Sequence, residues 1–415
     1  MNQCSIILGA GASIEFVKHP RLTSELIMQK LIDVNPWNNL LNRYLIDTQS
    51  ELNVEYILDL INKIKKANDN FEDLIEIIDK VCTLLNPHKF SDALLIRSVN
   101  YITKQSLEDS SDRFELLNVP LYIRELIAEI VREYNDALGK EPSSQKLLDL
   151  QRGFIKCLMK KFNKVSVHSL NYDDCILKSL KSLGFCTGFD DSGDFQKSEY
   201  QSANRVFSYL HGTPHFVPKF KYFSGNSAIV KYHDDCEVAS KERWRLSRTH
   251  PGLYTDGIVH PDYNHFITTG RTKDIHLYNQ PYASYYTRLA EDLDSADIIF
   301  IIGYSFGDEH INQLLSSIRW DNNPKSIIIV DYDNYEEEKI TENIYKKLYN
   351  IIIKLEKQYF ESYKEPINSC IIEQLARDNW AKIGHHELYY YNRGYESFLK
   401  EDLKKLIFNT FAQFL

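Results

Sequence analysis

Apolar residues occur along this chain in two kinds of segment. Short apolar runs, of which 298–302 (Ile-Ile-Phe-Ile-Ile) is the clearest, have the length of strands that are buried on both faces. Longer segments, such as 51–85, repeat apolar residues every three or four positions, which is typical of amphipathic helices. Strands that alternate with helices predict an α/β fold with a parallel sheet.

The expected elements also suggest how the chain is organised. Strands are predicted at 4–8, 165–170, 205–210, 297–302 and 326–330, with a further candidate at 387–391. Helices are predicted at 120–138, 144–162, 175–183, 283–296, 308–318 and near 397–415. We therefore expect a doubly wound parallel (Rossmann-like) sheet with a large helical insertion and a helical C-terminal region. The predicted parts are a sheet domain at 1–35 and 160–335, the insertion at 36–159 and the appendage at 336–415.

Composition excludes several classes of protein. Of the 415 residues, 43% are hydrophobic and 26% are charged, as in ordinary globular proteins. The net charge of −9 argues against nucleic-acid binding by the whole surface and leaves a local basic patch open. No apolar run approaches the roughly 20 residues of a spanning helix, and the N-terminus lacks the basic region of a secretory signal. The seven cysteines form no Cys-x-x-Cys pair, which predicts reduced thiols in a cytoplasmic protein.

Four loops with candidate chemistry each follow a predicted strand. They are 9–13 (Gly-Ala-Gly-Ala-Ser), 171–173 (Asn-Tyr-Asp), 211–212 (His-Gly) and 303–306 (Gly-Tyr-Ser-Phe). Because the carboxyl ends of parallel strands line the ligand crevice of such a sheet, we expect the four loops to converge.

The first of these loops, 9–13, predicts a phosphate site. Gly9 and Gly11 would let a phosphate approach the backbone, and the amides with the start of a following helix would favour an anion. Residue 14 is Ile, so the full G-x-G-x-x-G pattern is not present, and a tight structural turn is the alternative.

Other polar residues are open to two interpretations. Ser305 could bind a ribose or phosphate, whereas Asp308 and Glu309 are better explained as acids that begin a helix. Asp331 ends a predicted strand, where it could bind ribose hydroxyls or simply form a turn. His211 is expected to be an uncrowded imidazole, suited to general-base chemistry or to a structural role.

The segment 214–280 has few periodic signals, so we expect it to be functional or to hold a small inserted element. Within it, 233–237 (His-Asp-Asp-Cys-Glu) combines residue types that bind metals. Its spacing matches no zinc pattern, and a solvated loop without metal is predicted.

Taken in order, the motifs resemble the sirtuin superfamily, and more closely its divergent branch in prokaryotic anti-phage defence. Residues 9–13 look like the family's first NAD-binding loop. Residues 169–173 (Ser-Leu-Asn-Tyr-Asp) match the Thr-Gln-Asn-Ile-Asp motif at its Asn and Asp, and 210–212 (Leu-His-Gly) look like the strand-end His-Gly that carries the catalytic base. Residues 303–312 are similar to the Gly-Tyr-Ser-Phe-x-Asp-x-x-Ile-Asn signature of the divergent branch.

Two departures bear on the activity that this resemblance implies. Deacetylating sirtuins carry a four-cysteine zinc module and a Pro-Asp-Phe-Arg type of segment, and neither has a counterpart here. The divergent branch also lacks the zinc module and destroys NAD, so the resemblance implies an NAD⁺ glycohydrolase that uses NAD as its substrate and needs no metal.

The resemblance also assigns roles to residues. Asn171 would place the ribose and the attacking water, His211 would accept a proton, and Asp173 would orient nicotinamide or Asn171. The implied NAD-binding residues are Gly9, Ala10, Gly11, Ala12, Ser13, Gly303, Ser305, Phe306 and Asp331.

The family context implies partners as well. Related defence proteins form homo-oligomers or act with a HerA-like hexameric ATPase or an Argonaute, whereas direct nucleic-acid binding and membrane association are not expected. Two alternatives to hydrolysis stay open. One is a sensor or scaffold that binds NAD or ADP-ribose without cleaving it, and the other is a sirtuin-type deacylase or ADP-ribosyltransferase.

Overall fold

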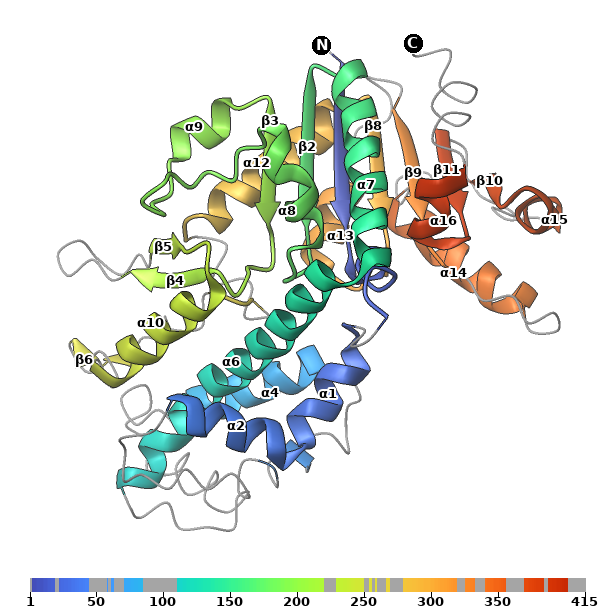
Figure 1. Ribbon diagram of the computed structural model, residues 1–415. Helices are drawn as coiled ribbons and strands as arrows, with labels where there is room; N and C mark the ends of the chain where they lie inside the picture. The colour runs from blue at the N-terminus through green and yellow to red at the C-terminus, as the bar shows by residue number, and fades with distance from the viewer. Residues whose placement is uncertain are drawn as a thin grey trace.

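A single seven-stranded sheet organises the part of the chain that the computed structural model describes (Figure 1). The described residues are 2–18, 22–44, 58, 61–62, 71–84, 110–219, 229–249, 254–255, 258–259, 266–268, 279–318, 325–332, 340–355, 369–383 and 387–401. The strands of the sheet are β1 (Gln3–Leu8), β2 (Lys164–Ser169), β3 (Arg205–Tyr209), β8 (Ile298–Ile302), β9 (Ser326–Val330), β10 (Trp380–Ile383) and β11 (Glu387–Tyr391).

The strand order is β10-β11-β9-β8-β1-β2-β3, which confirms the predicted doubly wound parallel sheet. β10 pairs with β11 in antiparallel fashion, and the other neighbouring pairs of the sheet are parallel. From β1 the chain proceeds first to β2 and β3 on one side and later to β8 and β9 on the other. The order of the strands therefore reverses between β1 and β8, where doubly wound sheets bind ligands.

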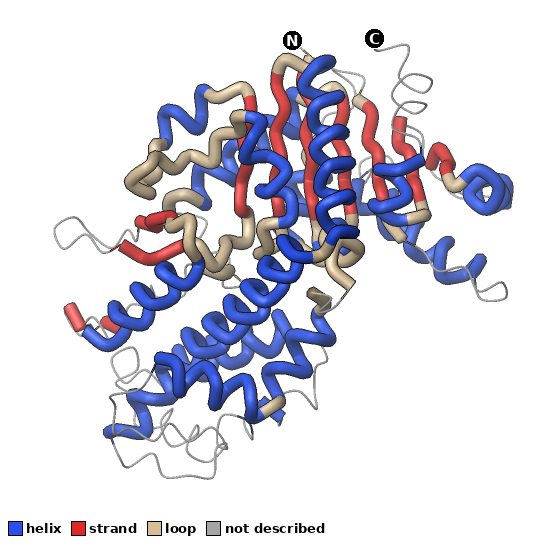
Figure 2. Tube along the Cα trace, in the orientation of Figure 1, coloured by secondary structure: helices blue, strands red, loops and turns tan. Residues whose placement is uncertain are grey.

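Helices cover both faces of the sheet, as the burial of β1, β8 and β9 along their whole length requires. On the front face in Figures 1 and 2 lie α7 (Pro142–Lys161), α8 (Cys175–Leu180) and α16 (Gly394–Glu401). On the back lie α12 (Tyr282–Ser295) and α13 (Glu309–Ser316). The Phe154 ring of α7 packs edge-on against Phe300 of β8 and Phe398 of α16, with ring centroids 5.3 and 5.6 Å away.

Between Val34 and Lys161, every element that the structure describes is helical. The helices before α7 are α1 (Ser24–Ile32), α2 (Val34–Tyr44), α4 (Phe71–Leu84) and α6 (Ser110–Lys140). They lie beyond the carboxyl ends of the strands (Figure 1). The 31-residue α6 connects this group to the sheet, and its Tyr134 hydroxyl donates to the Ser13 carbonyl at 2.6 Å. The helical insertion is thus joined directly to the edge that carries the candidate loops.

The remaining elements extend the sheet domain on both sides. A short helix α9 (Lys197–Ser202), two antiparallel pairs and α10 (Cys236–Thr249) lie between β2 and α12. The two pairs are β4 (Phe216–Lys219) with β5 (Ile229–Tyr232), and β6 (Tyr254–Thr255) with β7 (Ile258–Val259). The segment predicted to be irregular therefore contains a small inserted element.

The C-terminal region is not purely helical. It contains α14 (Ile340–Leu355) and α15 (Ser369–Asp378), but β10 and β11 also join the central sheet, and only β11 was expected. The helix predicted near 397–415 corresponds to α16 as far as Glu401, and 402–415 lie outside the described residues. Among the helices that the structure describes, none combines the length and the apolar character needed to cross a membrane.

Candidate active site at the carboxyl ends of the strands

The loops after β1 and β8 are in direct backbone contact where the strand order reverses. The amides of Gly9 and Gly11 donate to the carbonyls of Ile302 and Gly303, each at 2.9 Å. Gly303 has a φ of +61°, and a Cβ on it would lie 2.2 Å from the Ala12 nitrogen. The glycines therefore allow the two loops to approach more closely than residues with side chains would permit.

The predicted helix start at 9–13 is wrong. Residues Ala10–Ala12 form a single 3-10 turn, and α1 begins only at Ser24. The amides of Ala12 and Ser13 donate to carbonyls within this turn, at 3.0 and 3.1 Å. With Gly9 and Gly11 also engaged, Ala10 is the loop residue whose amide makes no such bond among the described residues. A helix N-terminus does not contribute to anion binding here.

Asn171 ties the loop after β2 to this glycine turn. Its side-chain amide donates to the Gly9 carbonyl at 2.9 Å and to the Ser13 hydroxyl oxygen at 2.8 Å. The residue is 9% exposed, and its amide oxygen takes no part in these two bonds. The fold therefore brings together two predicted site residues, Asn171 and Ser13, that are 158 positions apart in the chain.

Asp173 lies beside this group and is buried. One of its carboxylate oxygens accepts the amide of Cys175 at 2.9 Å, near the start of α8. Burial raises the pKa of Asp173 to about 6, although hydrogen bonds from the Cys175 amide and the Ser13 side chain act to lower it. Asn171, Asp173 and Ser13 thus form one polar group at the ends of β1 and β2.

His211 is not the uncrowded imidazole that we expected. Its Nε2 lies 2.8 Å from a carboxylate oxygen of Asp308, and the two side chains are 7% and 6% exposed. This contact places a proton on Nε2, since a carboxylate oxygen only accepts, and it makes Nδ1 the basic nitrogen of the neutral ring. The imidazole therefore has a fixed orientation and a partner for positive charge.

Asp308 has a second role, which the sequence did indicate. Its other oxygen accepts the amides of His310 and Ile311 at 2.9 and 3.3 Å, so that Asp308 is the N-cap of α13. The interpretation of Asp308 as a helix-start acid is confirmed, but its pairing with His211 was missed. The two residues are 97 positions apart, and no local pattern links them.

The turn 303–308 is held by its own side chains. The Tyr304 hydroxyl accepts the Asp308 amide at 3.1 Å and lies 3.0 Å from the Asn312 side-chain oxygen. The Asn312 amide donates to the Phe306 carbonyl at 2.9 Å, and Phe306 has a φ of +59°. The Phe306 ring is buried against Tyr304, whereas Ser305 is exposed. The Phe306 carbonyl is therefore used within the protein, where it also accepts the Lys354 ammonium, and the turn as a whole positions Asp308.

A cavity of about 360 Å³ opens where the loops after β1, β8 and β9 meet. Its lining includes Gly11, Gly303 and Asp331, which the sequence predicted as binding residues, together with Glu15 and Tyr332. Asp331 pairs with Lys347 of α14, with 2.6 Å between the ammonium nitrogen and the carboxylate. Carboxylates accept hydrogen bonds from ribose hydroxyls, so Asp331 suits the sugar of a nucleotide, and Lys18 adds a positive charge to the same lining.

The candidate residues therefore follow the edge of the sheet in strand order. His211 follows β3, the Asn171 group joins the ends of β2 and β1, and Asp331 follows β9. Tyr172, which follows Asn171 in the chain, has its ring centroid 6.3 Å from that of His211. From β3 to β9 there are four strand spacings, or roughly 19 Å, which is enough for an extended dinucleotide.

Comparison with known proteins gives a family for this part of the chain. Residues 165–354 match the family model described as the SIR2-like domain. The match runs from β2 into α14, and it includes Asn171, His211, the turn at 303–308 and Asp331. Residues 165–354 are therefore similar to a sirtuin-like domain, and such domains are generally NAD-dependent enzymes. No curated protein matches the sequence.

Proposed function

We propose that this protein is an NAD⁺ glycohydrolase that releases nicotinamide and ADP-ribose. The observation that carries the proposal is the pair of polar groups at the ends of adjacent strands β2 and β3. Asn171, bound to Ser13, and His211, bound to Asp308, lie after adjacent parallel strands and therefore at the same edge of the sheet, within the part of the chain that matches a SIR2-like domain.

The cavity beside Gly11 and Gly303 supports a site for the adenosine half of NAD. Asp331 would accept hydrogen bonds from the ribose hydroxyls. Tyr332 is 60% exposed at the rim and offers a ring face on which adenine can stack. From there the pyrophosphate would cross the exposed turn at Ala10 toward Asn171.

The proposed chemistry depends on the side chains of Asn171, His211 and Asp308. When the bond between nicotinamide and ribose breaks, its electron pair returns to the pyridine nitrogen, and nicotinamide leaves as a neutral molecule. The sugar becomes cation-like, so the enzyme must mainly orient the reactants and stabilise charge. The Asn171 amide oxygen would hold the ribose or the attacking water. His211 Nδ1 would accept the proton that this water loses, and Asp308 would stabilise the resulting imidazolium.

We also propose that the reaction depletes NAD during anti-phage defence, in an oligomer or with a partner such as a HerA-like ATPase. Support comes from the likeness of 303–312 to the defence-branch signature and from the helices joined to the site through α6. Because NAD loss harms the cell, such an enzyme needs control, and these helices are where we would place it.

The test is nicotinamide release from NAD by the purified protein, alone and with the protein encoded by the neighbouring gene. Asn171→Ala and His211→Ala should each abolish release, whereas Asn163→Ala, which changes an exposed residue before β2, should not. Full turnover in both site variants would contradict the proposed mechanism. Tight NAD binding by calorimetry without nicotinamide release under either condition would instead indicate a sensor.

A further inference from the structure

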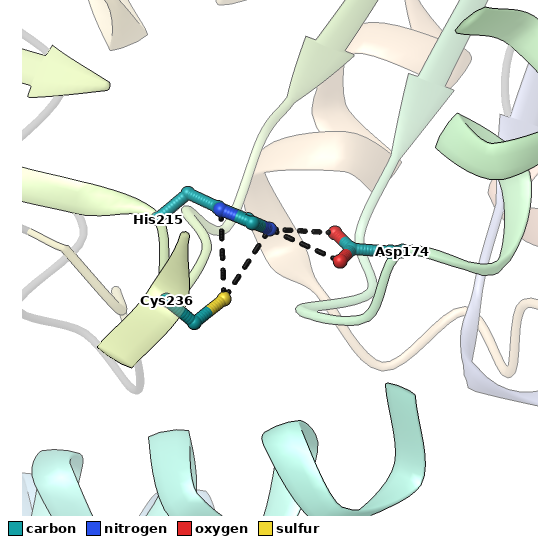
Figure 3. A group of neighbouring side chains, drawn as sticks. All are labelled: Asp174, His215 and Cys236. Atoms are coloured by element: carbon teal, nitrogen blue, oxygen red, sulfur yellow. Dashed lines mark hydrogen bonds and ion pairs between the residues drawn. The ribbon is translucent and has the colours of Figure 1, made fainter. Parts of the chain in front are cut away.

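Three potential metal ligands meet beside the candidate active site (Figure 3). Asp174 precedes α8, His215 lies in the segment after β3, and Cys236 is the first residue of α10. A ligand atom from each lies within 4.8 Å of the other two. His215 Nε2 is 3.0 Å from both carboxylate oxygens of Asp174 and 3.3 Å from the Cys236 sulfur.

The second nitrogen of His215 determines which one could bind a metal. Nδ1 lies 2.6 Å from the carbonyl oxygen of His233, and a carbonyl oxygen can only accept. Nδ1 therefore carries a proton. Nε2 faces Asp174 and Cys236; without a metal it also carries a proton, which it donates to the Asp174 carboxylate, and a metal ion would take the place of that proton. A histidine that binds a metal usually donates its other N–H to a carbonyl or carboxylate in this way.

Hydrogen bonds from neighbouring residues also hold Asp174 and the helix that carries Cys236. The Asn135 side chain of α6 donates to Asp174 at 3.1 Å. Helix α10, which carries Cys236, is anchored by Arg243, and this guanidinium binds Glu125 of α6 at 2.6 Å and the Pro214 carbonyl at 2.7 Å. Arg243 and Glu125 are buried, so the backbone on both sides of the cluster is fixed.

Two of the three ligand separations are close to those around a zinc ion, and the third, from Asp174 to Cys236, is no more than 4.8 Å. At usual zinc bond lengths, tetrahedral nitrogen and oxygen ligands lie roughly 3.3 Å apart, and nitrogen and sulfur ligands roughly 3.6 Å apart. The observed separations of 3.0 and 3.3 Å are each shorter by about 0.3 Å, a difference that small side-chain rotations can absorb.

A thiol nucleophile activated by histidine is a poorer explanation of the same cluster. Such a pair needs one ring nitrogen directed at the sulfur. The Cys236 sulfur instead lies at similar distances from both nitrogens of His215, 3.5 and 3.3 Å, as Figure 3 shows. Nδ1 is engaged by the His233 carbonyl and Nε2 by Asp174.

We propose that Asp174, His215 and Cys236 bind a zinc ion, with water as the fourth ligand. A thiolate and an imidazole select zinc over magnesium or calcium, and three protein ligands leave one position to solvent. The ion joins the segments after β2 and β3 only three residues beyond Asn171 and four beyond His211. Zinc binding thereby holds in place the two backbone segments that present these side chains.

The experiment measures bound metal on the full chain, purified without chelator and dialysed against metal-free buffer. We expect one zinc ion per chain by mass spectrometry. Cobalt replacement should give the absorption band of a thiolate bound to cobalt. Cys236→Ser should abolish that band, and Asp174→Asn and His215→Ala should lose most of the zinc. Cys186→Ser, which changes another partly exposed cysteine outside the cluster, should retain both signals.

Circular dichroism of each variant shows whether loss of metal reflects loss of folding, and a folded Cys236→Ser chain without the cobalt band supports the site. If the wild-type protein holds no more zinc than His215→Ala and gives no cobalt band, the proposal is overturned, and the cluster is an ion pair beside a thiol. Metal content is measured without NAD, so neither result depends on the proposed glycohydrolase activity.

Discussion

Asp308 performs two tasks with its two carboxylate oxygens, and substitution can separate them. One oxygen caps α13, and the other holds His211 at 2.8 Å. Asp308→Asn keeps an oxygen for the cap but turns an amide group toward His211. Because that group donates, it requires the imidazole proton to move from Nε2 to Nδ1, which removes the base from the position proposed for it. Asp308→Ala removes both functions.

The expected magnitudes differ accordingly. Loss of the N-cap costs about 1 kcal/mol, and a buried imidazole N–H without an acceptor costs about 2 kcal/mol. Asp308→Ala should therefore lower the free energy of unfolding by about 3 kcal/mol. Asp308→Asn should lose no more than about 1 kcal/mol. Nicotinamide release should nevertheless fall on the order of 100-fold or more in both variants, the usual contribution of a general base.

Urea unfolding followed by circular dichroism gives the stabilities, and nicotinamide release from NAD gives the activities. Wild-type turnover in Asp308→Asn would refute the argument that the carboxylate orients His211. Equal stability losses in Asp308→Asn and Asp308→Ala would refute the assignment of the cap.

Three further predictions follow from other contacts. Gly303→Ala would place a Cβ against the Ala12 backbone and should lower the free energy of unfolding by about 3 kcal/mol or more. Gly307→Ala is the control: its Cβ would meet only the Ser305 hydroxyl, at 3.4 Å, so the free energy of unfolding should change little. Tyr332→Ala should raise KM for NAD about tenfold without changing kcat, and Tyr332→Phe should not. Burial raises the pKa of Glu15, so the ionised side chain lowers the free energy of unfolding at pH values above that pKa. Glu15→Gln removes this charge and should therefore raise the melting temperature more at mildly alkaline than at acidic pH. Thermal melting at both pH values tests this difference.

Most of the sheet could be predicted because its strands are buried on both faces. Runs such as Ile298–Ile302 are apolar at every position, which leaves a strand as the simplest interpretation. β10 was missed because Trp380–Ile383 is four residues long and includes an exposed lysine, and its pairing with β11 fixes it at the sheet edge. The order of the strands then determined which loops would meet.

The contacts within the site were harder to predict because they join distant residues. The pairing of His211 with Asp308 and the cluster of Asp174, His215 and Cys236 link positions that no spacing rule connects. The prediction of a helix after Gly9 was wrong for a different reason. The amides that would have begun it are satisfied by carbonyls of the β8 loop and of the turn itself, and glycine makes that close approach feasible.

Helix α6 connects the outer helices to the loops at the ends of the strands. Its 31 residues span roughly 46 Å. Two consecutive residues of the helix donate hydrogen bonds to the strand-end loops, Tyr134 to the Ser13 carbonyl and Asn135 to the Asp174 carboxylate. A tilt of the outer end of this helix would therefore be felt at both strand-end loops, which links the position of the outer helices to that of the candidate site.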